Sequence, residues 1–218
     1  SSAASDVYKR QAIAYLVNKA DNEVNALTKL GIGIPGSLSP RTNLVRNANS
    51  TWLIGKPLKQ DLEKILKRDV LIENDANCFA ISEAFDGAGS KAHTVFGVIL
   101  GTGVGAGIVI GKKIHKGKNK IAGEWGHNPL PWANEGELPG KKCYCGRTGC
   151  LETFISGPAI EREFNNLHGK NLNMKNIVKE SGAGNFKAEQ TIRNFEDRLA
   201  RALAPVSYTH LRAHETSP

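Results

Sequence analysis

The residues best suited to metal chemistry lie between positions 127 and 150. Cys143, Cys145 and Cys150 follow the spacing Cys-x-Cys-x4-Cys, and His127 precedes them in a stretch rich in glycine, arginine and lysine. Three thiolates and one imidazole match the closed, four-coordinate site of a structural Zn²⁺ ion. The sequence therefore predicts a zinc loop over residues 127–150 that organises the chain and does not activate water. The alternatives are a reduced, metal-free cysteine cluster or a disulfide within it.

The segment GEWGHNPLPW, residues 123–132, brings a carboxylate close to this loop. Glu124 and His127 stand three residues apart, which places them on one face of a short helical turn. If His127 binds the metal, Glu124 is held beside the loop, and Glu152 is fixed likewise just after Cys150. Two carboxylates and a metal-fixed imidazole could then hold a polyol. Without this convergence, both carboxylates would be ordinary surface groups.

A third candidate is Asp75 in the segment ENDAN, residues 73–77. It follows an apolar strand and opens a helix, and the carboxyl ends of strands are where α/β proteins place their active groups. An aspartate here is also a good helix N-cap, which is the structural alternative. A catalytic role is favoured by neighbouring amides that could hydrogen-bond several hydroxyl groups, namely Asn74, Asn77, Asn47 and Asn49.

The glycine-rich segment GTGVGAG, residues 101–107, could bind an anion through its backbone N–H groups. It is not a P-loop, because no Gly-Lys-Ser/Thr follows. It is not a dinucleotide-binding turn either, because the apolar strand IVIG follows where a helix is required. The structural alternative is a tight glycine hairpin without a ligand.

The elements that must position these residues alternate between strands and helices, which predicts an α/β fold. We expect helices over residues 12–30, 57–66, 76–88, 158–167, 174–180 and 188–203 from their apolar spacing. Strands are expected over residues 30–37, 70–72, 94–100 and 105–110, the last two pairing as a hairpin. A Gly-Ser turn over residues 89–93 indicates a boundary between two lobes, and clefts between lobes are common sites for small molecules.

Composition narrows the class of protein. The 218 residues are 40% hydrophobic and 23% charged, as in an ordinary globular chain. No apolar run approaches the roughly 20 residues of a membrane span, so we expect no membrane partner. The net charge of +8 comes from scattered lysines without stacking aromatics, which favours an anionic small substrate over nucleic acid. Clustered cysteines fit a reducing cytoplasm, and Cys78 is expected to be a small buried apolar residue.

Both ends resemble translated cloning adaptor. Residues 1–11 and 206–218 carry no hydrophobic period, so we expect adaptor-like tails there. Genuine frayed termini are the alternative. Between the tails, we expect residues 12–90 to form part of an N-terminal lobe and residues 91–205 to form part of a C-terminal lobe.

Four motifs in this order resemble the ROK family of bacterial sugar kinases and repressors: NDAN, LGTGVGAG, GEWGHNP and CYCGRTGCLE. The resemblance covers nearly the whole of residues 12–205. GIPGSLSP, NANSTW and EWGHNPLPW are most similar to the fructokinase branch, with N-acetylglucosamine kinases as the next candidates. The resemblance to the family implies an actin-like, ribonuclease H-like sugar kinase fold with two lobes around a cleft.

The resemblance also implies roles for individual residues. Asp75 matches the family's catalytic base, and Gly101, Thr102 and Gly103 match a phosphate-binding segment. The sugar-holding positions are matched by Asn49, Asn74, Asp75, Glu124, His127 and Glu152. The zinc ligands are matched by His127, Cys143, Cys145 and Cys150, so that His127 would bind metal through one ring nitrogen and face the sugar with the other.

The implied activity is the phosphorylation of a hexose by ATP and Mg²⁺, with fructose to fructose 6-phosphate as the main prediction. N-acetylglucosamine kinase and glucokinase are the alternatives within the family. The family's first phosphate-binding turn and its C-terminal adenosine segment have no match here, so we expect an incomplete fold and little activity from this chain. The full-length parent is expected to be a cytoplasmic homodimer.

Two alternatives lie outside catalysis. A sugar-responsive repressor core would share this fold, but family repressors often lose their kinase residues and Asp75 is present. A metal-stabilised module that binds sugar without chemistry is the other alternative.

Overall fold

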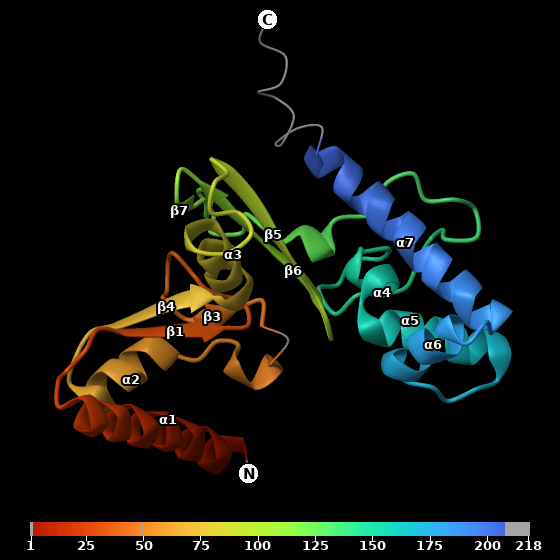
Figure 1. The fold of residues 1–218 in the computed structure, drawn as a ribbon. Coiled ribbons are helices and arrows are strands. Elements are labelled where there is room, and N and C mark those ends of the chain that lie inside the picture. The colour runs from red at the N-terminus through yellow and green to blue at the C-terminus, as the bar shows by residue number, and fades with distance from the viewer. Residues whose placement is uncertain (1, 49, 208–218) are drawn as a thin grey trace, which may run out of the picture. The chain divides into compact units, whose positions relative to one another are not determined.

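The computed structural model describes residues 2–48 and 50–207 of the chain, with the side chains of residues 2–8 and Thr51 left out of that description. The backbone forms two compact units (Figure 1). The N-terminal unit comprises Ser1–Cys78 with Lys116–Ile121, and the C-terminal unit comprises Phe79–His115 with Ala122–Pro218. The expected lobe limits at residues 90 and 91 and the expected tails stay predictions.

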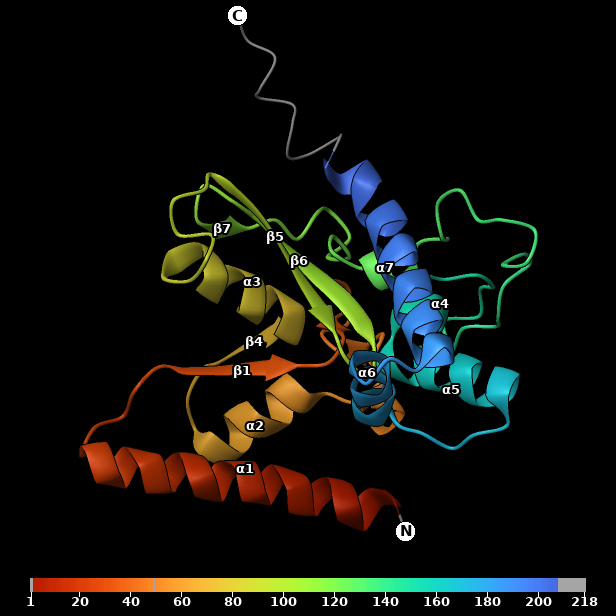
Figure 2. The ribbon, with the colours of Figure 1, turned by 45° about the vertical axis from the view of Figure 1, so that its right-hand side comes forward.

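The N-terminal unit is built on two parallel strands, β1 (Leu30–Ile34) and β4 (Val70–Asn74). They pair from Leu30 with Val70 to Ile34 with Asn74, so both strands end at the same edge. Helix α2 (Leu58–Leu66) lies between this sheet and α1 (Ser2–Val24) (Figure 2). The α2 stripe buries Leu58 and Leu62 against Val70. This core fixes the strand end from which Asn74 and Asp75 emerge.

Two short strands and one helical turn complete this unit. Strands β2 (Ser37–Leu38) and β3 (Val45–Arg46) pair antiparallel, and the 3₁₀ turn η1 spans Thr51–Leu53. A segment from later in the sequence, Lys116–Ile121, also belongs to this unit. The Arg46 side chain donates a hydrogen bond to the carbonyl of Asn119 in that segment. The N-terminal unit is therefore not continuous in sequence.

The first helix differs from its prediction. The expected range was 12–30, whereas α1 spans Ser2–Val24 and thus includes most of the expected N-terminal tail. The helix stops because Asn25 adopts a left-handed backbone with φ of 50°, and Leu27 beyond it is 84% exposed. The helix is held by polar contacts as well as by apolar ones: Arg10 pairs with Asp61 at 3.0 Å and Asp21 with Arg68 at 2.9 Å.

The C-terminal unit combines a three-stranded antiparallel sheet with several helices. Strands β5 (Thr94–Leu100), β6 (Val104–Ile110) and β7 (Lys113–Ile114) lie in that order, and β5 and β6 form the predicted hairpin. Helix α3 (Asp75–Phe85) begins in the N-terminal unit and packs Ala80 and Ala84 near Val109 of β6.

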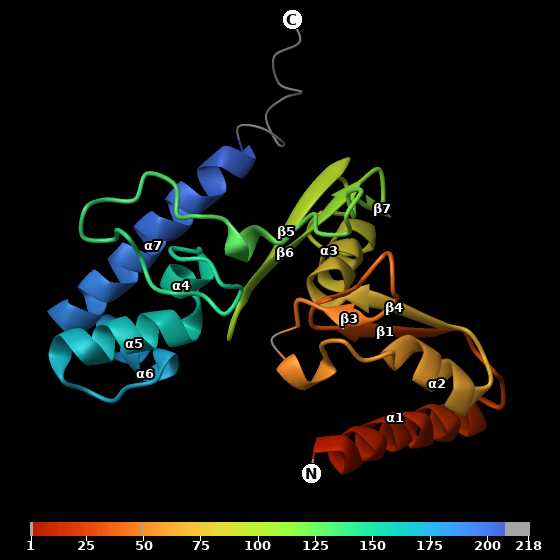
Figure 3. The same ribbon diagram turned by 180° about the vertical axis from the view of Figure 1, so that it is seen from behind.

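The remaining helices are α4 (Glu152–Ile155), α5 (Gly157–His168), α6 (Met174–Gly182) and α7 (Phe186–Val206). Helix α7 runs along α4 and α5 (Figure 3). The core between these helices and β6 contains Trp125, Leu151, Phe154 and Ile155. The last three predicted helices are confirmed within a few residues, as is the alternation of strands and helices. No helix in the described part of the chain is long and apolar enough to cross a membrane.

Candidate functional site

Asp75 lies where β4 passes into α3, as predicted. Its carboxylate accepts a hydrogen bond from the Ala76 N–H at 2.9 Å, and the residue is exposed. The turn is fixed mainly by Asn74, whose side-chain amide donates to the Gly36 carbonyl at 2.9 Å and accepts from the Asn77 N–H at 3.1 Å. Asn74 therefore caps the start of α3, while Asp75 exposes its carboxylate to solvent.

Glu73 supports the same turn, and no sequence pattern marked it. Its carboxylate accepts from the Asn74 N–H and from the Asn77 side-chain amide, each at 3.0 Å, and pairs with Lys116. Burial would raise the pKa of Glu73, but Lys116 and the two amide donors hold it below its usual value. Glu73 is therefore an ionised residue whose hydrogen bonds hold the turn that carries Asp75. Asn49, the other sugar residue expected in this unit, lies outside the described residues.

The GTG turn joins β5 to β6 in the C-terminal unit. The Gly101 N–H donates to the Gly103 carbonyl at 3.0 Å, and the Gly101 carbonyl accepts from the Gly157 N–H at 2.9 Å. Thr102 at its tip is exposed. A Cβ atom on Gly103 would lie 2.8 Å from Oε2 of Glu152, so a larger residue there would displace the end of the glutamate side chain. The turn is thus anchored to α4 and α5.

The GEWGH segment packs tightly against β6. The 3₁₀ turn η2 (Trp125–His127) confirms the predicted helical turn, with the His127 N–H donating to the Glu124 carbonyl at 3.2 Å. A Cβ atom on Gly126 would lie 2.0 Å from the Val104 carbonyl oxygen, which only glycine permits. The Trp125 indole N–H donates to the Ala202 carbonyl at 3.2 Å. His127 is therefore held between β6 and α7.

Glu152 contacts the end of the GTG turn. Its carboxylate accepts from the Val104 N–H at 3.0 Å, which is the first residue of β6 after the GTG turn. The glutamate is half-buried at the start of α4, two residues beyond Cys150. The C-terminal unit therefore brings Glu152 and the GTG turn into contact, a proximity that the sequence did not predict.

The four predicted metal ligands converge. One ligand atom from each of His127, Cys143, Cys145 and Cys150 lies within 4.8 Å of the others. His127 Nδ1 is 3.5 Å from Cys143 Sγ, and the sulfurs of Cys145 and Cys150 are 3.6 Å apart. All four cysteines of the chain are free thiols, so the disulfide alternative does not describe this structure. Three sulfurs and one nitrogen fit a tetrahedral Zn²⁺ ion and leave no open ligand position.

Backbone hydrogen bonds shape the cysteine loop. The Cys143 N–H donates to the Arg147 carbonyl at 2.8 Å, and the Gly146 N–H donates back to the Cys143 carbonyl at 3.0 Å. Burial, with the neighbouring Cys145 and Cys143, raises the pKa of Cys150 to about 12. The Cys150 thiol is therefore protonated when no metal is bound, so metal binding must release its proton.

Tyr144 is a site residue that the sequence analysis missed. Its hydroxyl lies 3.0 Å from His127 Nε2, and the two rings meet edge to face with centroids 5.1 Å apart. Burial raises the pKa of Tyr144, and the carboxylates of Glu152 and Glu124 raise it further. The tyrosine hydroxyl therefore contacts His127, one of the sugar residues expected in this unit. No sequence signal indicated it, because any residue type can stand between the first two cysteines.

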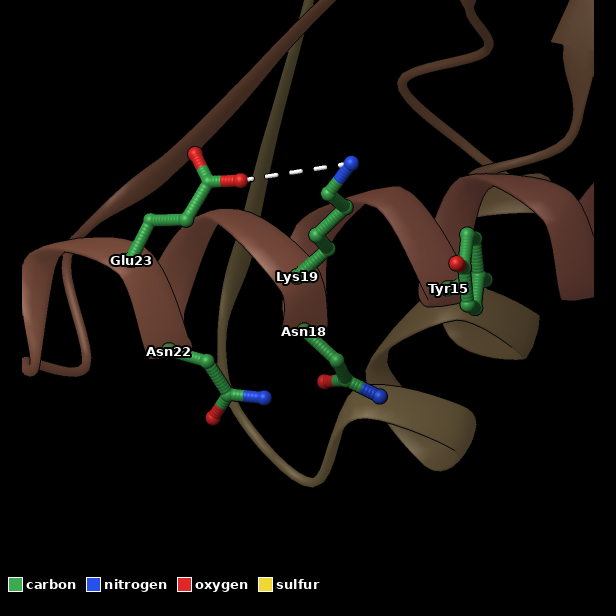
Figure 4. A pocket seen from close by; sticks show the side chains of 5 residues that line it. All are labelled: Tyr15, Asn18, Lys19, Asn22 and Glu23. Carbon is green, nitrogen blue, oxygen red and sulfur yellow. Dashed lines mark ion pairs between the residues drawn. The ribbon is translucent and has the colours of Figure 1, made fainter.

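A shallow hollow on α1 contains none of these residues. It is lined by Tyr15, Asn18, Lys19, Asn22 and Glu23, which project from successive turns of one helix (Figure 4). Lys19 and Glu23 form an ion pair there at 4.0 Å. A surface formed by a single helix provides no enclosing walls for a ligand, so the candidate site is the set of motifs described above.

This chain is similar to known proteins in both sequence and fold. The family model described as "ROK family" matches residues 6–210. N-acetyl-D-glucosamine kinase of Pectobacterium carotovorum is 41% identical over 192 residues, which is 86% of this chain and 63% of that enzyme. The enzyme of the same name from Vibrio vulnificus is 40% identical over 194 residues, which is 87% of this chain and 64% of the enzyme. The chain thus spans just under two thirds of these relatives.

Two solved structures have the same fold. A ROK hexokinase from Thermus thermophilus matches with a TM-score of 0.79 and 28% identity, covering 92% of this chain and 65% of that one. A ROK glucokinase from Streptomyces griseus, solved with glucose and AMPPNP, matches with a TM-score of 0.72 and 28% identity, covering 91% and 67%. The predicted α/β, actin-like sugar kinase fold is confirmed.

The names of these relatives match an alternative of the sequence analysis and not its main prediction. The kinases that match at about 40% identity are named for N-acetyl-D-glucosamine and not for fructose. The convergence of His127 with the three cysteines fits the zinc motif that the resemblance implied. With a family model matched over residues 6–210 and the same fold in solved family members, the chain belongs to the ROK family.

Proposed function

We propose that this protein transfers the γ-phosphate of ATP to a hydroxyl group of N-acetyl-D-glucosamine. The observation that carries the proposal is the identity of about 40% to N-acetyl-D-glucosamine kinases over 86–87% of the chain. By contrast, the ROK transcriptional regulator among the solved structures is 22% identical, which supports a common fold alone. A kinase is therefore the better proposal than a repressor core.

Asp75 is the proposed general base. A sugar hydroxyl is a weak nucleophile at neutral pH, so a fixed carboxylate assists by accepting its proton as the bond to phosphorus forms. The Asp75 carboxylate is exposed at the end of β4. The hydrogen bonds of Asn74 to Gly36 and Asn77 fix the backbone that presents it.

The proposed sugar ligands are Asn49, Asn74, Glu124, His127 and Glu152. The two glutamates and His127 all lie in the C-terminal unit, where Tyr144 contacts His127. Carboxylates accept hydrogen bonds from sugar hydroxyls, and His127 Nε2 offers one more polar contact. A sugar hydroxyl at that nitrogen must compete with the Tyr144 hydroxyl, which lies 3.0 Å from it.

The GTG turn is the proposed contact for phosphate, through the backbone of Gly101, Thr102 and Gly103. Its anchoring by Gly157 and Glu152 gives it a defined shape before ATP binds. Mg²⁺, when bound with ATP, supplies neutralisation of the charge on the transferring phosphoryl group. The chain's part is to orient the hydroxyl and the phosphate, and to accept a proton at Asp75.

Zn²⁺ is the proposed occupant of the cysteine cluster. When bound, it supplies rigid cross-linking of the loop, because all four ligand positions come from the protein. His127 is then fixed as a shared element of the metal centre and the sugar site. The expected homodimer, cytoplasmic location and absence of a nucleic-acid partner stay predictions.

A chimera tests the proposal. The 194 residues that match the Vibrio vulnificus N-acetyl-D-glucosamine kinase would replace the corresponding segment of that enzyme, because the match spans 64% of its length. ADP release is then measured with N-acetyl-D-glucosamine, glucose and fructose. The proposal predicts the highest kcat/KM for N-acetyl-D-glucosamine. A preference for fructose or glucose contradicts the substrate.

The Asp75→Asn variant of the chimera tests the base. The change keeps the size of the side chain and removes its ability to accept a full proton. We expect kcat to fall by about 10²–10⁴-fold while the sugar still binds. The matched control is Asp86→Asn, at an exposed aspartate just beyond α3. A D75N chimera with the turnover of the control refutes the assignment.

A further inference from the structure

The two ring nitrogens of His127 face different partners. Nδ1 lies 3.5 Å from the Cys143 sulfur, and Nε2 lies 3.0 Å from the Tyr144 hydroxyl. His127 is only 8% exposed, so its ring has little access to water. A buried imidazole needs protein partners for its polar atoms, and the identity of those partners selects its tautomer.

A metal ion bound at Nδ1 uses the lone pair of that nitrogen. The proton of a neutral imidazole must then be on Nε2, where it needs an acceptor. The Tyr144 oxygen is at hydrogen-bonding distance, and the edge-to-face angle of 85° keeps the two rings nearly perpendicular. When metal occupies Nδ1, the tyrosine oxygen is therefore placed to accept a hydrogen bond from the Nε2–H, which fits the tautomer that metal binding requires.

Tyr144 is a largely exposed residue of the cysteine loop. The residue is 57% exposed although its hydroxyl points at a buried histidine. The turn that carries it is closed by hydrogen bonds of the neighbouring backbone, between Cys143 and Arg147 and between Gly146 and Cys143. The turn therefore presents Tyr144 beside the metal ligands, and the hydroxyl is its main specific contact with His127.

We propose that Tyr144 is a positioning residue of the metal centre, whose hydroxyl oxygen accepts a hydrogen bond from the Nε2–H of His127 and so aims Nδ1 at the three sulfurs. Outer partners of metal-bound histidines typically change metal affinity by about 10–100-fold when they are removed. The proposal rests on the zinc centre of the proposed function, but it does not depend on kinase activity or on the identity of the sugar.

The test is a Zn²⁺ titration of the 218-residue chain against a chromophoric chelator. Tyr144→Phe removes one oxygen and keeps the ring. The matched control is Tyr15→Phe, the same change at a tyrosine that is 67% exposed on α1. We expect the affinity of Y144F for Zn²⁺ to fall by about 10–100-fold and that of Y15F to equal the unaltered chain. Equal affinities of the two variants overturn the role of Tyr144. Failure of the unaltered chain to bind Zn²⁺ overturns the zinc centre and the role together.

A spectroscopic measurement separates positioning from a general effect on folding. With Co²⁺ at saturation, we expect the visible d–d bands of Y144F to differ from those of Y15F, because the imidazole ligand is no longer held in one orientation. Identical Co²⁺ spectra count against the proposal.

A second measurement needs no variant. In the zinc-loaded, ¹⁵N-labelled chain, the Nε2 proton of His127 should exchange slowly with solvent and show a nuclear Overhauser effect to the Tyr144 ring. A fast-exchanging proton without this contact overturns the proposal even if Y144F fails to fold.

Discussion

Replacing Glu137 with glutamine should destabilise the C-terminal unit by about 3 kcal/mol. Glu137 is a buried carboxylate in the loop before the cysteines, with a side chain that is only 5% exposed. It accepts hydrogen bonds from Arg198 Nε at 2.8 Å and from Arg201 Nη2 at 2.9 Å. Both arginines belong to α7, so Glu137 ties that helix to the loop.

The magnitude follows from the ionisation of this carboxyl group. Burial would raise the pKa of Glu137, but Arg201 and Arg198 overcome this effect and lower it from 4.5 to about 2. One tenfold change in proton affinity corresponds to about 1.4 kcal/mol, so the ionised form is favoured by about 3 kcal/mol in the folded state. Glutamine resembles the protonated acid in shape, and breaking a buried ion pair typically costs about 3–5 kcal/mol.

The assay is urea unfolding followed by tryptophan fluorescence, with a chelator present so that metal binding does not contribute. The matched control is Glu189→Gln, which removes the same charge from the exposed face of α7, where Arg193 is 68% exposed. We expect the control to lose no more than about 0.5 kcal/mol. A loss for E137Q within 1 kcal/mol of the control, on the order of the error of such measurements, refutes the argument.

The same group predicts a pH dependence. The pKa of Glu137 is lowered on folding, so its stabilisation is fully present above pH 4.5 and is lost as the pH falls toward about 2. The free energy of unfolding should therefore fall more steeply in the unaltered chain than in E137Q over this interval. Parallel curves for the two proteins contradict the assigned pairing.

Three further perturbations follow from the packing around the metal loop. Gly126→Ala should lower the free energy of unfolding by more than about 2 kcal/mol, because its Cβ would lie 2.0 Å from the Val104 carbonyl oxygen. The control Gly182→Ala has open space around it and should not lower the free energy of unfolding, and urea unfolding compares the two variants. Trp125→Phe removes the donor to the Ala202 carbonyl and should cost about 1–3 kcal/mol in the same assay. Removing zinc with a chelator should lower the Tm of the zinc-loaded chain, and re-addition should restore it; an unchanged Tm shows that the cluster does not bind metal in the folded state.

Local sequence patterns predicted the elements that present the site. The hairpin of β5 and β6 and the passage from β4 into α3 follow from apolar runs broken by glycine and by ENDAN, which are local signals. The start and end of α1 were wrong, because the apolar spacing continues past Val24 to Leu27, whereas Asn25 ends the helix by adopting a left-handed conformation. The left-handed backbone of Asn25 therefore set the end of the helix, although the apolar spacing continued beyond it.

Contacts distant in sequence were not predictable in the same way. Glu137 meets Arg198 and Arg201 across 61 and 64 residues, and no motif links them. Tyr144 is close to His127 only because the cysteine loop folds back on η2. The metal ligands were predictable because zinc demands particular residue types, whereas the residues that orient those ligands are restricted only by geometry.

The most direct test of the account is a calorimetric titration of the 218-residue chain with N-acetyl-D-glucosamine, first loaded with Zn²⁺ and then stripped of metal. If the ion holds the loop that carries His127, sugar binding should be measurable in the loaded chain and at least tenfold weaker after stripping, as is typical when support around a metal-bound histidine is lost. Equal sugar binding in the two states, or none in the loaded chain, contradicts a metal-organised sugar site.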